Sequence, residues 1–370
     1  MDTESIEKQI KDIEDEIFNT QKNKATEHHI GKLKAKIARL REQIEIRRSA
    51  GGKGKGFSIK KSGDATVGLI GFPSIGKSTL LNQLTNAESE IGYYDFTTLD
   101  VIPGMLHYKG AQIQILDLPG LIIGASKGKG RGKEILSAIR NVDLILLITD
   151  AIHSYQIRHM SDELSTAGIR MNKKKPDVVI TLTKQGGIKI HITQKMTKMQ
   201  EKTMYSIASE YVTNADIIVR EDIDENEFID AFIQNRIYIP AIAVINKIDL
   251  ISNKEVNTQK KLLESGGWTV VSISAEKAIG IDKLKEQMFS SINLIRIYMK
   301  PQGKKPDYDV PLILRKGDTV ETVCKKIHRD FKRKFRYAQV WGKSGKYPGQ
   351  KVGLDHELYD EDVLTVIIIH

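Results

Sequence analysis

The segment from Gly71 to Ser78 has the residue types and the spacing needed to hold phosphate groups. It fits the pattern GxxxxGK[ST], with an apolar strand before it and a helix after it. Glycines let backbone N–H groups turn toward phosphate oxygens, and the helix N-terminus adds partial positive charge. We expect Lys77 to neutralise the β- and γ-phosphates and the Ser78 hydroxyl to ligate Mg²⁺. The candidate phosphate-binding residues are Gly71, Phe72, Pro73, Ser74, Ile75, Gly76, Lys77, Ser78 and Thr79.

A second candidate segment, Asp117-Leu118-Pro119-Gly120, ends the next apolar strand. An Asp at the carboxyl end of such a strand is placed to hold Mg²⁺ through water, and the Gly120 N–H can sense a γ-phosphate. A DxxG sequence alone is common in turns. Its position at a strand end, after the phosphate-binding segment, favours the metal interpretation.

The tetrapeptide Asn246-Lys247-Ile248-Asp249 predicts which base the site accepts. The Asp249 carboxylate can accept hydrogen bonds from both N1–H and the exocyclic amine of guanine, and adenine lacks this donor pair. Ser274 and Ala275 end the last core strand and are expected to offer a backbone N–H to guanine O6. The sequence therefore predicts a site for GTP and GDP, and a GTPase rather than an ATPase.

Phe96, Thr97 and Thr98 lie between the first two segments. A hydroxyl there can reach Mg²⁺ only while the γ-phosphate is present, which would make the segment a switch. The two adjacent threonines leave the register open, and a helix cap or strand pair is the structural alternative. The candidate catalytic residues are Lys77, Thr98 and Gly120, and the candidate metal ligands are Ser78, Thr98 and Asp117.

Alternating apolar strands and helices must position these segments. Such a pattern indicates an α/β fold with a parallel-type sheet covered on both faces. The predicted strands are 67–70, 112–116, 143–148, 241–245 and 269–273.

The interval from Asp117 to Asn246 is much longer than two strand–helix–strand steps, which need about 60 residues. We therefore expect an inserted α+β subdomain at 170–237. Period-two alternation in 178–183 and 188–192 predicts a β-hairpin, followed by a helix at 193–212 and a strand at 216–219.

The two ends of the chain have different patterns. Isoleucines and leucines at helical spacing predict two helices within residues 4–48, and a packing seam is favoured over contact with nucleic acid. After residue 294 we expect a small β-rich module with one helix from Thr319 to Phe335. The predicted domains are a helical hairpin (1–50), a basic Gly/Lys linker (51–64), the two parts of the GTPase domain (65–169 and 238–293), the insertion (170–237) and the C-terminal module (294–370).

Charge and cysteine content limit the environment and the partners. Lys and Arg total 57 against 47 Asp and Glu, a net charge of +10, which fits either a nucleic-acid partner or a solvated lysine-rich surface. Cys324 is the only cysteine, so no intrachain disulfide can form. The longest apolar stretches are too short to cross a bilayer. We expect a cytoplasmic protein without membrane contact.

Several segments together resemble a known family. GFPSIGKST, YDFTTLDVIPG, DLPGLIIGASKGKGRGKEIL and NKID resemble the Obg superfamily of translation-associated GTPases, and over essentially the whole chain the sequence is similar to the developmentally regulated GTP-binding (DRG) proteins. The resemblance implies an N-terminal helical hairpin, an interrupted P-loop GTPase domain, a ribosomal-S5-domain-2-like insertion and a C-terminal TGS domain of ubiquitin-like β-grasp shape.

The resemblance also bears on the reaction. It favours Thr98 as the switch threonine, with Thr97 beside it. Leu121 follows Gly120 where Ras-like enzymes carry a water-positioning Gln, so intrinsic hydrolysis should be slow or assisted. Many relatives hold K⁺ with a P-loop Asn, and Ser74 at that place leaves potassium dependence open.

Family membership would imply ribosome or ribosomal RNA binding, and eukaryotic DRG proteins are associated with zinc-finger partner proteins. We expect a monomer. The sequence supports RNA binding through a basic run at 325–336, in which Asp330 is the only acid, and a second patch (Arg170 and Lys173 to Lys175) reads equally well as a solvated loop. Tyr337 and Trp341 could stack on bases, but a place in the module's core is favoured. A nucleotide-gated scaffold with incidental hydrolysis is the alternative to a GTPase switch.

Overall fold

The computed structural model describes residues 3–50, 62–85, 102–118, 138–233 and 235–369. The chain divides into two compact units, one of Met1–Gly56 with Lys173–Tyr238 and one of Phe57–Asn172 with Ile239–His370. Most of the predicted linker, the predicted switch with Phe96, Thr97 and Thr98, and the stretch with Pro119, Gly120 and Leu121 lie outside the described residues.

The second unit is built on a six-stranded sheet in the order β11-β10-β4-β1-β3-β2. Its first five strands in that order pair in parallel, and β2 runs antiparallel to β3 at one edge. Every residue of the central strand β1 is buried. This is the α/β sheet that the sequence predicts. The strands are β1 (Ala65–Gly71), β2 (Ile102–Tyr108), β3 (Ala111–Asp117), β4 (Leu144–Asp150), β10 (Ala241–Asn246) and β11 (Thr269–Ser272).

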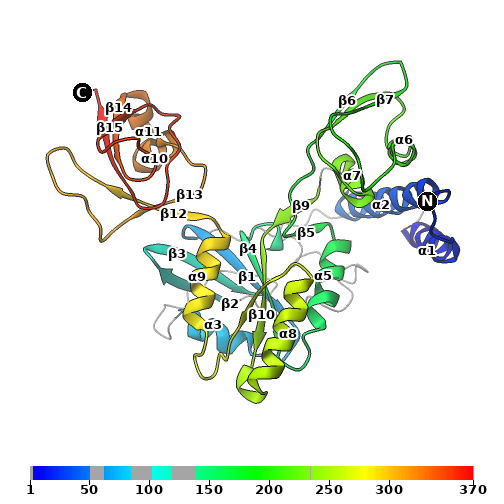
Figure 1. The fold of residues 1–370 in the computed structure, drawn as a ribbon, viewed down its shortest axis with the longest axis horizontal. Helices are drawn as coiled ribbons and strands as arrows, with labels where there is room; N and C mark the ends of the chain where they lie inside the picture. Colours follow the sequence, from blue (N-terminus) through cyan, green and yellow to red (C-terminus); the bar gives the residue numbers. More distant parts are fainter. Residues whose placement is uncertain (1–2, 51–61, 86–101, 119–137, 234, 370) are drawn as a thin grey trace. The chain divides into compact units, whose positions relative to one another are not determined.

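Helices cover both faces of this sheet. Figure 1 shows α3 (Lys77–Thr85) and α9 (Ile281–Ser291) on one side, where their leucines and Met288 share a buried cluster with β1 and β3. On the other side lie α5 (Gln156–Thr166) and α8 (Asn253–Ser265). A short 3-10 helix, η1 (Ile248–Leu250), follows β10.

The C-terminal module is a five-stranded sheet in the order β13-β12-β16-β14-β15, with two short helices on one face. Val320, Val323 and Cys324 of the first helix share a buried core with Ala338 and Val340 of β14. The elements are β12 (Leu294–Met299), β13 (Leu312–Arg315), α10 (Val320–Ile327), α11 (Arg329–Arg333), β14 (Phe335–Trp341), β15 (Gln350–Val352) and β16 (Asp362–Ile368).

The prediction of one helix from Thr319 to Phe335 is wrong. His328 is extended (φ −162°, ψ 136°) and separates α10 from α11, and its ring nitrogen accepts a hydrogen bond from the Asp330 N–H at 3.2 Å. The side chain thus caps α11 at the place where the first helix ends.

The basic run of this module is also less free than its sequence suggests. Glu321 pairs with both Lys325, at 3.0 Å, and Lys332. Lys326 reaches Asp64 at 3.3 Å, and Arg333 reaches Asp330 at 3.4 Å. Asp330 is therefore not the only acid that meets the run, because Glu321 and Asp64 come from outside it.

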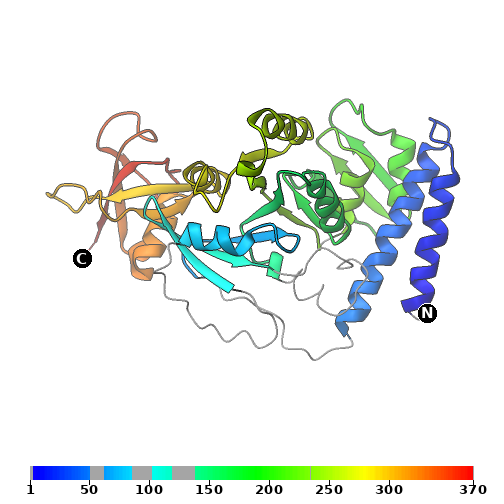
Figure 2. The ribbon, with the colours of Figure 1, turned by 90° about the horizontal axis from the view of Figure 1, so that it is seen from below.

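The first unit joins the N-terminal helices to the insertion. Figure 2 shows α1 (Thr3–Asn19) and α2 (Glu27–Ala50) side by side. The predicted packing seam between them is confirmed by a buried cluster of Ile6, Ile10, Ile13, Leu33, Ile37, Leu40 and Ile44. In the insertion lie β6 (Val178–Leu182), β7 (Ile188–Ile192), α6 (Glu201–Ala208), β8 (Ala215–Val219) and α7 (Glu225–Phe232); β5 (Ile169–Met171) and β9 (Ile237–Ile239) lie where the chain passes between the units.

The predicted hairpin in the insertion is wrong. β8 lies between β6 and β7, antiparallel to the first and parallel to the second. Ala215, Ile217 and Val219 of β8 are fully buried, which is typical of a central strand and explains why this strand displaces the hairpin pairing. The helix predicted at 193–212 is limited to α6, because Asp222 binds the N–H groups of Thr197 and Lys198 instead.

Helix α2 packs on α6 and α7 of the insertion. Ala35 belongs to the insertion's buried core, and the Tyr211 hydroxyl donates to the Ala35 carbonyl at 3.0 Å. Lys34 pairs with Glu225 at 2.5 Å. At Gly31 a Cβ would lie 2.8 Å from the Thr203 methyl, so the helices approach closely there. No described helix is both long and apolar enough to pass through a bilayer.

Replacing Gly31 with Leu should loosen α2 from α6. Overpacking of this kind costs about 1–3 kcal/mol, and Thr203 is fully buried and has no room to move. Faster hydrogen exchange of the α6 amides is the expected result. Lys36→Leu, at an exposed position of the same helix, is the control. Unchanged exchange in α6 of the Gly31 variant would show that this contact is not tight.

Candidate nucleotide-binding site

The phosphate-binding segment is a tight loop between β1 and α3. Two of its residues have left-handed backbone conformations, Ser74 with φ 61° and Gly76 with φ 90°. Such angles turn successive N–H groups to one side of a loop, and α3 begins at once with Lys77. The loop therefore has the shape of an anion-binding concavity at a helix N-terminus.

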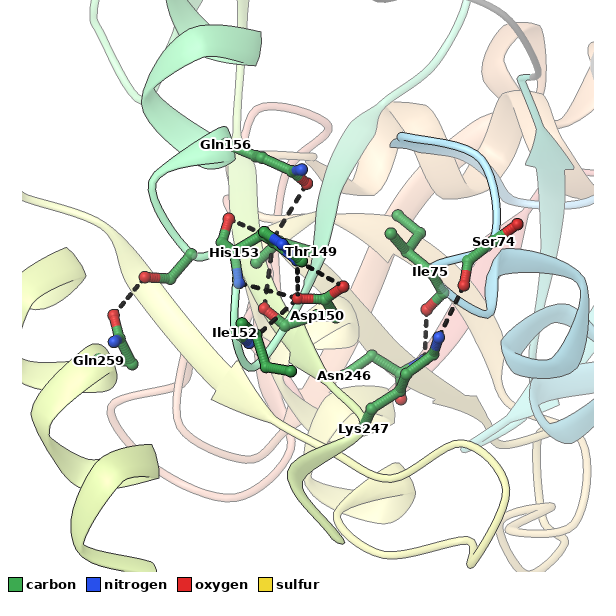
Figure 3. Close-up of polar contacts among 11 residues, drawn as sticks. Ser74, Ile75, Thr149, Asp150, Ile152, His153, Gln156, Asn246, Lys247 and Gln259 are labelled. Carbon is green, nitrogen blue, oxygen red and sulfur yellow. Dashed lines mark hydrogen bonds and ion pairs between the residues drawn. The ribbon is translucent and has the colours of Figure 1, made fainter. Parts of the chain in front are cut away.

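Asn246, at the carboxyl end of β10, ties this loop to a second one. Its side-chain Nδ2 donates to the Ile75 carbonyl at 2.8 Å (Figure 3). Its Oδ1 accepts from the Ala275 N–H at 3.0 Å. The residue is only 2% exposed. A Cβ at Gly76 would lie 2.5 Å from Asn246 Nδ2, so this position needs glycine both for its backbone angle and for the close approach.

Two lysines are bonded to carbonyls of the phosphate-binding loop. Lys247 donates to the Ser74 carbonyl at 2.7 Å (Figure 3), and Lys77 donates to the carbonyls of Gly71 and Phe72 at 3.1 and 2.9 Å. Burial lowers the pKa of the Lys77 ammonium, and the nearby Asp117 carboxylate opposes that shift only in part. Lys77 is thus a partly desolvated cation whose hydrogen-bond acceptors in this loop are neutral carbonyl groups.

Asp117 ends β3 beside α3 and is 6% exposed. Burial raises the pKa of its carboxyl, while the Lys77 charge and the Ser78 hydroxyl act in the opposite direction. The Ser78 hydroxyl lies 3.5 Å from Asp117 Oδ2, and Oδ1 is buried without a hydrogen-bond partner among the described residues. An orphaned carboxylate oxygen beside a serine hydroxyl fits a hard cation such as Mg²⁺.

Asp249 and the Ser274–Ala275 turn lie on the other side of Asn246. A hydrogen bond from the buried Ser274 hydroxyl lowers the pKa of the Asp249 carboxyl, and Lys277 is 3.6 Å away. The carboxylate therefore stays ionised as an acceptor. In this structure the N–H of Ser274 donates to the Ile279 carbonyl and the N–H of Ala275 donates to Asn246 Oδ1. Their predicted contact with guanine O6 therefore stays a prediction.

Leu118 is buried and donates its N–H to the Leu69 carbonyl, which fixes the end of β3 against β1.

Asp150 and His153 were not identified from the sequence. Asp150 ends β4 as the register partner of Asn246, and its Oδ1 accepts from the N–H groups of Ile152 and His153 and contacts His153 Nδ1 at 2.8 Å (Figure 3). Burial would raise the pKa of Asp150, but the bonds from His153 and Ile152 outweigh it and lower the pKa. The sequence signal that could have indicated Asp150 is an Asp at the end of an apolar strand. These contacts hold the turn that begins α5.

The structure thus brings the described candidates together from β1, β3, β10 and β11, at the carboxyl ends of the strands, where ligands bind in open α/β sheets. Phe72 stacks on His159 of α5, with ring centroids 6.4 Å apart. Ile248 and Asp249 lie in η1, and Thr79 lies in the first turn of α3. In the second basic patch, Arg170 donates to the Ser165 carbonyl at 2.5 Å.

Comparisons with known proteins agree with this geometry. Residues 66–184 match the family described as 50S ribosome-binding GTPase, residues 185–294 its C-terminal region, and residues 295–368 the TGS domain. A GTP-binding protein of Methanocaldococcus jannaschii is 53% identical over 99% of this chain and 94% of its own. GTP-binding protein 1 of Schizosaccharomyces pombe is 47% identical over 97% and 98%. Developmentally-regulated GTP-binding protein 2 of Homo sapiens is 46% identical over 98% and 99%.

Lys77→Ala should abolish measurable GTP and GDP binding, because the phosphate charge would then lack its partly desolvated cation. Isothermal titration calorimetry is the measurement, with Lys254→Ala at an exposed position of α8 as the control. Near-normal affinity in the Lys77 variant, with the control also binding, would contradict the placement of the phosphates in this loop.

Asp249→Asn should reduce the preference for guanine. The amide presents a donor where the carboxylate presents only acceptors, and a mismatch of this kind costs about 1–3 kcal/mol. The ratio of GTP to ATP affinity is the quantity to measure, and Asp282→Asn, at an exposed position of α9, is the control. An unchanged ratio would remove Asp249 from base recognition.

Proposed function

Because the chain belongs to the developmentally regulated GTP-binding protein family of GTPases, we propose that it is a Mg²⁺-dependent switch whose bound nucleotide sets how it engages the ribosome in translation. The observation that carries the nucleotide part is the group formed by Lys77, Ser78 and Asp117. In it a partly desolvated cation lies beside a carboxylate of which one oxygen has no hydrogen-bond partner among the described residues.

The roles of the described residues follow from their positions. The Lys77 ammonium leaves the carbonyls of Gly71 and Phe72 and pairs with the β- and γ-phosphates, whose negative charge opposes the lowering of its pKa. The loop N–H groups hold the α- and β-phosphates. Asn246 keeps the loop fixed while Asp249 accepts from the guanine edge.

Ser78 and Asp117 would hold Mg²⁺, and the ion would supply charge stabilisation at the phosphate oxygens. Asp117 Oδ1 would then have the partner that it lacks among the described residues. Thr98 and Gly120 would report the γ-phosphate, Thr98 through its hydroxyl and Gly120 through its N–H, with Thr97 as the alternative ligand; both segments lie outside the described residues.

Slow intrinsic hydrolysis is part of the proposal. Leu121 has no polar group with which to orient water, so an activator or a cation has to supply that function. Ser74 is the position at which K⁺ would be held, and it already has the left-handed backbone that Asn adopts readily. We further propose that the chain is a cytoplasmic monomer and that it works with a zinc-finger partner protein.

The ribosomal part is supported by the net charge of +10 and by the match to a family described as ribosome-binding. Leu121 is the one observation that favours the second candidate, a nucleotide-gated scaffold that binds RNA or the ribosome and hydrolyses GTP only incidentally. The two differ in whether anything accelerates hydrolysis.

Single-turnover GTP hydrolysis should be slow in sodium buffer and faster with K⁺ or ribosomes. Ser74→Asn should strengthen the response to K⁺, since it supplies an amide oxygen where Ser offers a shorter hydroxyl, and Ser74→Ala is the matched control. No acceleration under any of these conditions would favour the scaffold.

A chelator tests the proposed Mg²⁺ dependence. Hydrolysis should be lost when the chelator removes Mg²⁺ and restored when Mg²⁺ is added back.

A further inference from the structure

The β-grasp sheet of the C-terminal module has a face that its helices do not cover. Ala338 and Val340 of β14 point into the core with α10, so Tyr337, Gln339 and Trp341 lie on the opposite face. The expectation that Tyr337 and Trp341 fill the core is therefore wrong. We call the surface formed by Tyr298, Tyr337, Gln339, Trp341 and Lys351 the aromatic face.

Strand register places these side chains in rows. Tyr298 of β12 and Trp341 of β14 are both partners of Val363 in β16, so they share one row across three strands. Gln339 is paired with Thr365 on one side and with Lys351 on the other. Tyr308, which is 61% exposed, lies with its ring centroid 5.0 Å from that of Tyr298 and extends the row.

Cations lie over the rings of this face. Lys300 Nζ is 4.0 Å from the centroid of Trp341, and Lys351 Nζ is 4.8 Å from that of Tyr337. Arg336 lies 5.9 Å from the Tyr337 ring. Within the described part of the chain, none of these three cations has a carboxylate ion-pair partner. Arg296 differs, because Asp360 and Glu361 neutralise it.

This combination differs from an ordinary protein-binding patch. Aromatic rings beside unneutralised Lys and Arg are the arrangement that takes nucleobases on the rings and phosphates on the cations. Tyr337 and Trp341 are four strand residues apart, about 13 Å at the usual rise. Neighbouring bases in a duplex are far closer, so the two rings fit bases that are separated and unpaired.

We propose that the aromatic face binds single-stranded RNA. Unpaired bases stack on Tyr337 and Trp341, the Gln339 amide lies between them to bond a base edge, and Lys300, Lys351 and Arg336 meet the phosphates. Each ammonium moves from the ring face to the backbone as a base takes its place. Only the source of the RNA, the ribosome, rests on the proposed function, because binding at this face needs neither nucleotide nor hydrolysis.

Fluorescence tests the stacking without altering the face. Trp268 and Trp341 are the two tryptophans of the chain, so Trp268→Phe leaves Trp341 as the reporter. Titration with an oligouridylate of roughly eight nucleotides, within the usual range of single-strand sites, should quench that fluorescence saturably. An RNA duplex of the same length should bind more weakly and quench little. Saturable binding of the single strand without quenching, or equal binding of the duplex, would overturn the proposal.

Charge-matched variants separate this face from general attraction. Lys300→Gln/Lys351→Gln removes two positive charges from the face, and Lys325→Gln/Lys332→Gln removes two that form ion pairs with Glu321. The first pair should weaken binding by about tenfold or more, as should Tyr337→Leu, and the second pair should have little effect. Equal losses in both pairs would mean that net charge alone attracts RNA. GTP hydrolysis, measured in parallel, should be unchanged, so failure here is distinct from failure of the switch.

Discussion

The bridge made by Asn246 is the contact on which the candidate nucleotide site depends. Its side chain donates to the loop after β1 and accepts from the turn after β11, so one buried amide sets the spacing between the predicted phosphate and base regions. Gly76 is required by the same contact, since any side chain there would meet the amide nitrogen. Asp150, its register partner on β4, fixes the neighbouring turn through His153.

Contiguous features of the site could be predicted from the sequence, and contacts between distant segments could not. The phosphate-binding loop and the tetrapeptide at 246–249 are local patterns, and their positions at strand ends follow from hydrophobic periodicity. Lys247 bonding to Ser74 is not a local pattern, because its two residues are brought together only by the sheet order. Nothing adjacent to Asp117 in the sequence indicates that one of its oxygens lacks a partner among the residues that the structure describes.

The wrong predictions about the fold have the same origin, which is contact between segments that are distant in the sequence. Two alternating strands joined by a glycine turn favour a hairpin, but a third strand whose inward residues are all fully buried takes the place between them. The basic run looked unopposed because Glu321 and Asp64 lie outside it in sequence. Tyr337 and Trp341 alternate with Ala338 and Val340, and alternation separates two faces without saying which one is covered. Only the position of α10 decides that.

The site also carries a cost that the rest of the second unit offsets. Ser74 and Lys247 hold left-handed backbone angles without being glycine, and one buried oxygen of Asp117 has no partner in the part of the chain that the structure describes. The lowered pKa of Lys77 and the raised pKa of Asp117 show that each ion is disfavoured by burial more than it is helped by the other. Such groups persist because β1 is buried along its whole length and holds the loop in place. On our proposal, a triphosphate and its cation would oppose both pKa shifts at once, so the buried charges that destabilise this region would become the source of its affinity for the nucleotide.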